Sequence, residues 1–217
     1  MARNKRIQAI VEALQGYHTV LDIGTDHGYV LKDALDLNYI QKGIASDLRE
    51  KPLQKAKERL KNYPVTFYQS DGFLSIDIPF DVAVIAGMGS YTIIDILKKR
   101  PDLKEDLMVM PHDNIDVLRR YLAENNFMIE YEKIIYDRHF YTLFKIKRGK
   151  MNLSEKEIHT GFHSVIDSTY QAYLLYVIKH YEHLVQVSTY DKKAYLKNIL
   201  TYYKEVLHDI HDGATIY

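Results

Sequence analysis

The chain has 217 residues, enough for one α/β domain and a smaller appendage. Its 29 lysines and arginines balance 29 aspartates and glutamates, which excludes a chain that is basic throughout, so any contact with nucleic acid must come from local patches. The absence of cysteine excludes disulfides, thiolate nucleophiles and cysteine-bound metals, and no apolar run approaches the roughly 18 residues that span a bilayer. We therefore expect a cytoplasmic, monomeric protein that uses no metal and does not enter a membrane.

The first 149 residues alternate between helical and strand-like patterns. Residues 4–15 carry apolar side chains at helical spacing and predict an amphipathic helix. Short β-rich runs then predict strands at 18–24, 43–47, 64–72, 80–87 and 106–111. Helices are expected between them, beginning near Gly28, Glu50, Gly89 and Asp113. Such alternation predicts a parallel sheet with helices on both faces, which residues 127–137 and 139–149 close as an antiparallel pair.

After Gly149 the pattern changes to heptad-like spacing. A short linker helix is expected around 154–161, and two long helices should follow, with a turn and an N-cap at the sequence STYD, residues 188–191. The predicted seam between these helices consists of Tyr173, Val177, His180, Leu184 and Val187 on the first and Leu196, Ile199, Tyr203, Val206 and Ile210 on the second. We therefore predict a domain at 1–149 and an antiparallel, coiled-coil-like helical domain at 150–217.

Acids and glycines recur where the predicted parallel strands end. The first strand ends at Asp22 and Gly24, the second ends at Asp47, and the third and fourth end at the pairs Asp71-Gly72 and Gly87-Met88. In open α/β sheets, ligands bind outside the carboxyl ends of the strands. An acid at the end of the second strand, 23 residues past Gly24, suits a ribose hydroxyl and predicts a nucleoside-containing ligand.

The first glycine turn, GTDHG at residues 24–28, favours a ligand without phosphate. In a dinucleotide site Asp26 would lie near the pyrophosphate, and like charges a few ångströms apart repel by about 1–4 kcal/mol. A G-x-x-x-x-G-K-[ST] loop for ATP is absent from the sequence. S-adenosylmethionine has a sulfonium cation, an ammonium group and a ribose diol, so an acid-lined turn favours it as the cofactor.

Each of these features also has a simpler interpretation. Asp22 and Gly24 can form a strand-to-helix turn with a local cap, Asp47 can cap the helix that follows it, and the pair Asp71-Gly72 can be a plain turn. The occurrence of such residues at successive strand ends is much harder to explain without a ligand.

The segments LDIGTDHGYV, IASD, SDG, VIAGMG and PHDNIDVLRRYLAENNFMIEYEKIIYD resemble the bacterial tRNA (adenine-N1)-methyltransferase family that modifies adenine 22. The resemblance covers about residues 3–149, and the helical C-terminus matches that family in architecture. It implies a class I, Rossmann-like methyltransferase domain followed by a helical hairpin. It also implies S-adenosylmethionine as cofactor, tRNA as partner, and methyl transfer to N1 of an adenine in the D-arm.

The resemblance also implies roles for individual residues. Asp26, His27 and Tyr29 would lie at the catalytic rim, and Arg6 and Tyr29 would face the substrate. The cofactor would contact Asp22, Gly24, Asp47, Leu48, Asp71, Gly72, Gly87 and Met88. The sequence departs from the family pattern at Ser90, at Met110-Pro111-His112 and at Arg138-His139, which concerns base recognition more than cofactor binding.

The expected chemistry needs little from the protein beyond alignment and charge. Adenine N1 carries a lone pair and no proton, so it can attack the methyl group without a general base. The product base is cationic, and the Asp26 carboxylate would stabilise that charge. His27 would orient Asp26 or contact the base, unless it only makes a local hydrogen bond, and Tyr29 would stack on a flipped adenine, unless it packs in the core.

Two other functions remain open from the sequence. One is a methyltransferase that acts on another RNA or on a small molecule, and the other is a non-catalytic RNA-binding module. Nine of the 19 tyrosines lie after Gly149, some near lysines, and such residues either contact RNA or pack in the helical seam.

Overall fold

The structure is a computed structural model that describes residues 4–161 and 166–211. Seven strands form one sheet: β1 (Thr19–Ile23), β2 (Lys42–Asp47), β3 (Val65–Gln69), β4 (Val82–Met88), β5 (Asp106–Pro111), β6 (Phe127–Asp137) and β7 (His139–Arg148). The helices are α1 (Lys5–Ala13), α2 (Tyr29–Asp36), α3 (Glu50–Arg59), α4 (Ser90–Lys98), α5 (Ile115–Glu124), α6 (Glu155–Thr160), α7 (Ser168–Val187) and α8 (Tyr190–His211). These elements confirm the predicted order of strands and helices.

The strand order is β3-β2-β1-β4-β5-β7-β6. Strands β1 to β5 pair in parallel, whereas β7 runs antiparallel to both β5 and β6. The chain reverses its direction of progress across the sheet between β1 and β4, so the helices after these two strands diverge and leave a crevice at their carboxyl ends. The fold is the predicted α/β class with an antiparallel closing pair.

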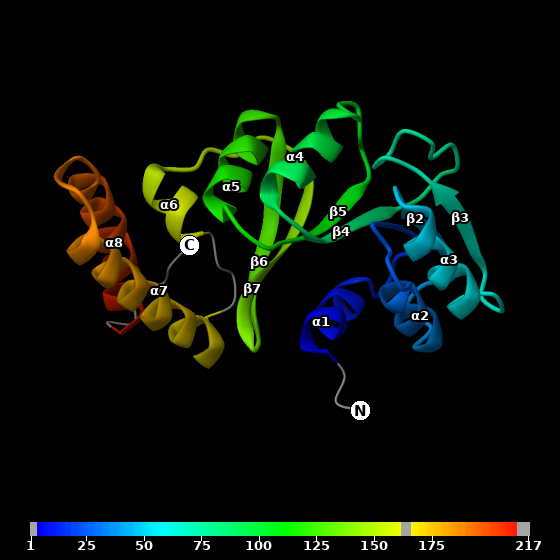
Figure 1. Cartoon of the computed structure of the whole chain (residues 1–217), viewed down its shortest axis with the longest axis horizontal. Coiled ribbons are helices and arrows are strands. Elements are labelled where there is room, and N and C mark those ends of the chain that lie inside the picture. Colours follow the sequence, from blue (N-terminus) through cyan, green and yellow to red (C-terminus); the bar gives the residue numbers. More distant parts are fainter. Residues whose placement is uncertain (1–3, 162–165, 212–217) are drawn as a thin grey trace.

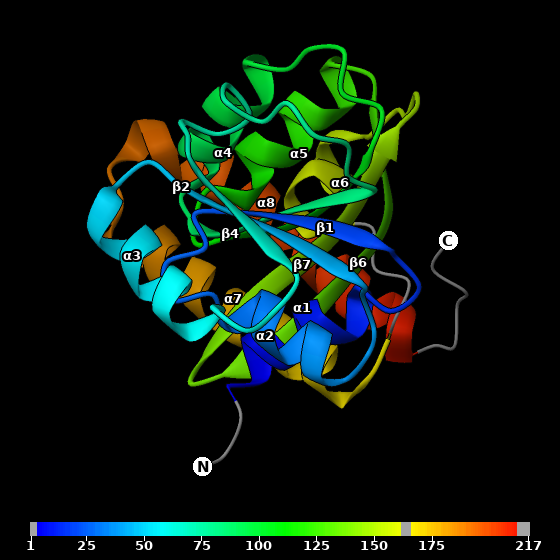
Figure 2. The same cartoon turned by 90° about the vertical axis from the view of Figure 1, so that its right-hand side faces the viewer.

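Helices cover both faces of the sheet (Figures 1 and 2). Helices α1, α2 and α3 pack on one face around a core that includes Leu14, Leu31 and Leu60, all fully buried. Helices α4 and α5 pack on the other face around Ile93, Leu118 and neighbouring apolar residues. In the described part of the chain, no helix is both long and apolar enough to cross a membrane.

The two long helices α7 and α8 form the predicted hairpin beside the outer strand β6 (Figure 1). They have an apolar cluster of their own, which reaches the sheet through Ile134 of β6. The proposed division of the chain at Gly149 stays a prediction, because the hairpin shares this cluster with the sheet rather than standing apart from it.

The predicted seam is only partly correct. On α8, Ile199, Tyr203 and Val206 are buried as expected. On α7, His180 and Val187 are exposed, so their seam assignment was wrong. Because α7 packs on β6 as well as on α8, its buried face is shifted off the predicted stripe towards Tyr170, Leu174 and Ile178, beside Tyr173 and Val177.

A buried ion pair joins the hairpin to the sheet. Arg119 of α5 donates two hydrogen bonds to the carboxylate of Glu132 on β6, each 2.9 Å long. Its third nitrogen donates to the backbone oxygens of Ile158 and His159 at the end of α6, at 2.9 and 3.0 Å. Tyr203 of α8 donates its hydroxyl to the same His159 oxygen. One guanidinium therefore connects α5, β6 and α6, and Tyr203 extends the network to α8.

Replacing Arg119 with methionine should lower the free energy of unfolding by about 3–5 kcal/mol, because Glu132 would stay buried without its cation. Urea denaturation measures this loss. The double variant Arg119→Met/Glu132→Met should recover most of it, since an apolar pair of similar volume leaves no buried charge. A loss below about 1 kcal/mol in the single variant would contradict the assigned role of this ion pair.

Candidate active site

A cavity of about 580 Å³ lies at the carboxyl ends of β1 to β4. Asp26 lines it together with seven of the eight residues that the sequence assigned to the cofactor: Gly24, Asp47, Leu48, Asp71, Gly72, Gly87 and Met88. These residues come from four different strand ends, and the parallel sheet brings them to one edge. The structure therefore brings the predicted residues together around one cavity.

Gly24 sits where β1 and β4 approach each other. Its φ of 74° lies in the left-handed region that favours glycine, and a Cβ at this position would overlap the end of the Met88 side chain. The amides of Gly24 and Thr25 both donate to the backbone oxygen of Ser46 on β2, at 2.8 and 2.9 Å. The turn is thus tied to the neighbouring strand and held open towards the cavity.

The two carboxylate oxygens of Asp47 bind backbone amides of two different segments, the start of α3 and the glycine turn. Its Oδ1 accepts a 2.9 Å bond from the Arg49 amide, and its Oδ2 accepts a longer 3.4 Å bond from the Asp26 amide. The residue at the helix N-cap is Arg49, without a side-chain cap bond, so Asp47 does not cap α3. Asp26 itself has a positive φ of 48°. Asp47 therefore holds a strained turn while its carboxylate lines the cavity.

Asp22 lies beneath the cavity wall rather than in it. The side chain is buried, and its Oδ2 accepts a 2.7 Å hydrogen bond from the Thr25 hydroxyl. The pKa of Asp22 is raised to about 6, mainly because burial penalises the charged form; the Thr25 hydrogen bond lowers it and the nearby charge of Asp47 raises it by smaller amounts. Asp22 therefore does not line the cavity, and it acts on a ligand through its charge and through the position of Thr25, to which it is hydrogen-bonded.

Helix α4 contributes a part of the wall that sequence reasoning missed. Thr92, Asp95, Ile96 and Lys99 all line the cavity, and their spacing of three, one and three residues places them on one face of the helix. This spacing was a readable signal once α4 was placed after Gly89. Lys99 forms a 2.5 Å ion pair with Oδ2 of Asp71, so Asp71 is a paired acid.

The charges of the cavity favour a cationic ligand. Four carboxylates line it, from Asp26, Asp47, Asp71 and Asp95, against the two cations of Arg49 and Lys99. Lys99 is paired with Asp71. The Nε atom of Arg49 lies 3.8 Å from Oδ1 of Asp47, but the Arg49 side chain is largely exposed to solvent, so the cavity keeps an excess of negative charge.

His27 and Tyr29 lie outside the cavity lining, on the side of Asp26. The Nε2 atom of His27 is 3.6 Å from Oδ2 of Asp26, and its ring centroid is 5.7 Å from that of Tyr29. Tyr29 is 44% exposed, and the guanidinium of Arg59 lies 3.9 Å from its ring centroid. The interpretation of Tyr29 as a core residue was therefore wrong, and one of its faces already holds a cation.

Arg6 lies on another part of the rim and does not line the cavity. Its guanidinium is 4.7 Å from the ring centroid of Tyr141 on β7, and this ring is 6.3 Å from that of His112. The His112 amide donates to the backbone oxygen of Met88 at 2.9 Å. Arg6, Tyr141 and His112 thus form a chain of contacts that leads from α1 to the end of β4. Tyr141 is a residue that the sequence did not single out.

Within residues 4–161 and 166–211, no group of three or more metal-ligating side chains is arranged to hold an ion. The site is thus a cavity lined by acids and large enough for a nucleoside. Around it lies a rim of aromatic and basic side chains, formed by Tyr29 with Arg59 and by Tyr141 with Arg6.

Comparisons with known proteins agree with this geometry. Residues 3–144 match the family model described as a methyltransferase domain. A Mycoplasma pneumoniae protein named "Putative tRNA methyltransferase" is 33% identical over 152 residues, which is 66% of this chain and 71% of that protein. The tRNA (adenine(22)-N(1))-methyltransferase of Bacillus subtilis is 30% identical over 141 residues, 61% of this chain and 59% of that protein.

A solved structure extends the likeness to the hairpin. TrmK of M. capricolum, in complex with S-adenosyl-homocysteine, superimposes with a TM-score of 0.80. The match covers 94% of this chain and 96% of that chain, at 24% sequence identity. Because it covers nearly all of both chains, the helical hairpin belongs to the shared fold.

Replacing Asp22 with asparagine should stabilise the protein at neutral pH. In the folded state the raised pKa penalises the ionised carboxylate, so a cost develops as the pH rises from about 4 to about 6 and stays constant above that. The variant should gain about 3 kcal/mol of unfolding free energy at pH 7.5 and only about 1 kcal/mol at pH 4.5. Urea denaturation at the two pH values measures the difference, and a gain independent of pH would contradict the shifted titration.

Proposed function

We propose that this chain, which belongs to the methyltransferase-domain family, transfers a methyl group from S-adenosylmethionine to N1 of adenine 22 in the D-arm of tRNA. The observation that carries the proposal is the acid-lined cavity at the carboxyl ends of β1 to β4. The names of the Mycoplasma pneumoniae and Bacillus subtilis relatives support the tRNA substrate, and the ligand of the M. capricolum structure supports the cofactor.

The cavity fits S-adenosylmethionine by size and by charge. Its volume of about 580 Å³ lies within the roughly 300–1,000 Å³ of small-molecule sites. Asp47 is placed to accept hydrogen bonds from a ribose diol, and the apolar side chains of Leu48 and Ile96 line the same cavity and suit an adenine ring. Asp71 keeps Oδ1 as an acceptor, since Lys99 contacts Oδ2. When bound, the cofactor supplies an electrophilic methyl group on a sulfonium.

The protein's part in the reaction is to position the adenine and to stabilise charge. Gly87 and Met88 bring β4 to the cavity, with Gly87 in the left-handed region at φ 78° and the Nε2 atom of His112 3.9 Å from the position that a Cβ would take. Asp26 stands at the cavity with a side chain that is 60% exposed, where it stabilises the cationic base. His27 lies beside that carboxylate, and Tyr29 offers a ring to stack on the base.

The rim suits a large substrate better than a small molecule. Asp26 and Tyr29 are exposed, and the contacts of Arg59, Arg6 and Tyr141 continue the basic and aromatic surface away from the cavity. A polynucleotide contacts such a surface through its phosphates and unstacked bases. The proposal therefore includes tRNA as partner and a monomer in the cytoplasm as the acting species. Another RNA is the second candidate, because the rim does not itself define position 22.

Replacing Asp47 with alanine should weaken binding of S-adenosylhomocysteine about 10- to 100-fold, because the ribose loses a charged acceptor worth about 1.5–3 kcal/mol. Isothermal calorimetry measures the dissociation constant, and a thermal melt shows whether the turn at residues 24–28 survives. The Asp47→Asn variant is the matched control for shape, and it should bind with intermediate affinity. Equal affinity for all three proteins would remove Asp47 from the ribose site.

Incubation with S-adenosylmethionine and an unmodified tRNA transcript tests the reaction itself. Methylation at N1 blocks the pairing edge of adenine, so reverse transcription should stop or misincorporate at adenine 22. Asp26→Asn keeps the shape and removes the charge, and it should slow methyl transfer roughly 10- to 100-fold with little change in cofactor affinity. A stop at another adenine would favour the second candidate, and no product from a cofactor-binding protein would refute the proposed function.

A further inference from the structure

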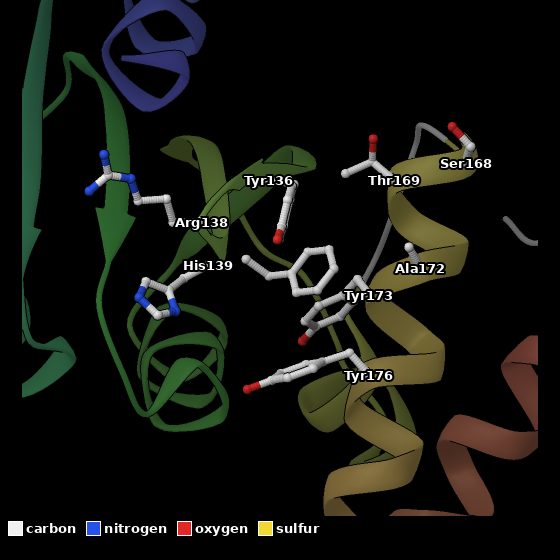
Figure 3. A pocket seen from close by; sticks show the side chains of 9 residues that line it. Tyr136, Arg138, His139, Ser168, Thr169, Ala172, Tyr173 and Tyr176 are labelled. Carbon is white, nitrogen blue, oxygen red and sulfur yellow. The ribbon is translucent and has the colours of Figure 1, made fainter.

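A second cavity, of about 560 Å³, lies between the turn that joins β6 to β7 and the first turns of α7 (Figure 3). From the turn it is lined by Tyr136, Arg138, His139 and Phe140, and from α7 by Ser168, Thr169, Ala172, Tyr173 and Tyr176. Neither the cofactor cavity nor its rim uses any of these residues. The cavity is therefore a separate feature that the proposed reaction leaves unexplained.

Aromatic rings make up much of its wall. The ring of Phe140 lies at the centre, with centroids 4.9 Å from Tyr136, 5.4 Å from Tyr176 and 5.6 Å from Tyr173. Tyr173 is buried, whereas Tyr136 and Tyr176 are 50% and 60% exposed. Two large rings thus keep open surface beside a cluster that holds them in place, which is how a platform for a planar ligand is built.

Arg138 adds a cation in a strained position. It is the single residue between Asp137 and His139, which pair across the turn, and its φ of 63° lies in the left-handed region. A side chain there costs about 1–2 kcal/mol relative to glycine. Figure 3 shows that the Arg138 and His139 side chains extend from the turn on the side away from α7. Two acids lie nearby in the sequence. Asp167 accepts a hydrogen bond from the Tyr170 amide at the start of α7, and Asp137, next to Arg138, is half-buried.

The turn projects beyond the edge of the sheet that carries the cofactor cavity. Strand β7 pairs with β5 through Phe144 and Val109, and β5 ends two residues later at Pro111. Because β7 is antiparallel to β5, its earlier residues run past this end. Tyr141 lies beside His112 on the rim of the cofactor cavity, and Arg138 is three residues, or about 10 Å, further along the strand. One chain of basic and aromatic groups therefore connects the two cavities.

We propose that this second cavity binds an unpaired nucleotide of the substrate tRNA, with its base against Tyr136 and Tyr176 and its phosphate at Arg138. The inference rests on the proposed function, since it extends the same substrate from the methyl-accepting adenine to a second contact. Proteins recognise unpaired nucleotides by stacking bases on aromatic rings and by placing arginine on the phosphate. The hydroxyls of Ser168 and Thr169 offer hydrogen bonds to the base edge.

The matched pair Tyr176→Ala and Tyr176→Phe tests the stack. Alanine removes the ring, and phenylalanine removes only the hydroxyl. Binding of an unmodified tRNA transcript to the full-length protein with S-adenosylhomocysteine should weaken at least about 5-fold in Tyr176→Ala and less than about 2-fold in Tyr176→Phe. In methyl transfer the same loss should appear in KM for tRNA, with kcat unchanged. Equal tRNA affinity of the alanine and phenylalanine variants would overturn the inference.

Arg138→Gly is an independent test, because the two interpretations predict different effects on tRNA binding. If Arg138 only shapes the turn, glycine leaves tRNA binding unchanged. If it contacts a phosphate, binding weakens and the slope of log affinity against log salt concentration falls by about 0.7–1. The melting temperature should not fall in either case, since glycine adopts this φ without strain. An unchanged slope together with unchanged affinity would overturn the phosphate assignment.

Two readouts separate this inference from the proposed function. Methyl transfer by the unchanged protein tests the function alone. A transcript with 4-thiouridine in its unpaired positions tests the second cavity alone, because ultraviolet cross-links should map to peptides that contain Tyr136 or Tyr176. If the protein methylates tRNA but its cross-links fall only on other peptides, the function stands and the inference falls.

Discussion

The position of the helical hairpin depends on the buried ion pair between Arg119 and Glu132. A buried pair of this kind contributes little net stability compared with apolar side chains of the same volume, because both charges lose their hydration. What it contributes is geometry. The guanidinium is planar and its donors point in defined directions, so it fixes two carboxylate oxygens and two backbone oxygens of α6 at once. Through Tyr203 the same network reaches α8, and α7 is then held against β6. Together with the apolar cluster between α7 and β6, this arrangement places α7 beside the β6–β7 turn, where the second cavity lies.

The charges of the cofactor cavity, unlike those of the Arg119–Glu132 pair, are not balanced. Here four carboxylates line the cavity against two cations, and beneath them the pKa of Asp22 is raised mainly by its burial and only slightly by the charge of Asp47. Such a site is unfavourable when empty and becomes favourable with a cation, so the same charges that weaken the fold select the ligand. A pyrophosphate would increase the repulsion, whereas a sulfonium or an ammonium group reduces it. The preference for a methyl donor over a dinucleotide therefore follows from the sign of the charges, and the glycine turn alone does not decide it.

The sequence predicted those features that depend on local pattern. Asp47 and the pair Asp71-Gly72 could be recognised as strand ends, because each follows a strand-like run of residues. In a parallel sheet such ends lie at one edge, so their proximity could also be predicted. It did not predict the Asp71–Lys99 pair or the burial of Asp22, because both depend on how α4 and β2 pack, which no local pattern records. The seam of α7 was misread at His180 and Val187 for the same kind of reason, since packing on a second partner shifts the buried face of a helix away from the stripe that a heptad predicts. The burial of Arg119 is likewise a result of the fold, which places Glu132 of β6 opposite it.

The cofactor cavity and the surface proposed for the substrate lie on different strands of the sheet. The short strands β1 to β4 end together and form the cofactor cavity, whereas β6 and β7, with 11 and 10 residues, extend past β5, which has six. That difference in length carries Tyr141 to the rim and Arg138 beyond it, so the long hairpin reaches outwards along the path that a large substrate must take. Of the departures from the resembling family, those at His112 and Arg138-His139 lie on this outer part of the sheet, whereas Ser90 begins the helix α4 that lines the cavity. Residues that bind a constant cofactor are limited by its chemistry, while those facing an extended RNA have several geometric solutions, and a strained arginine at a tight turn is one of them.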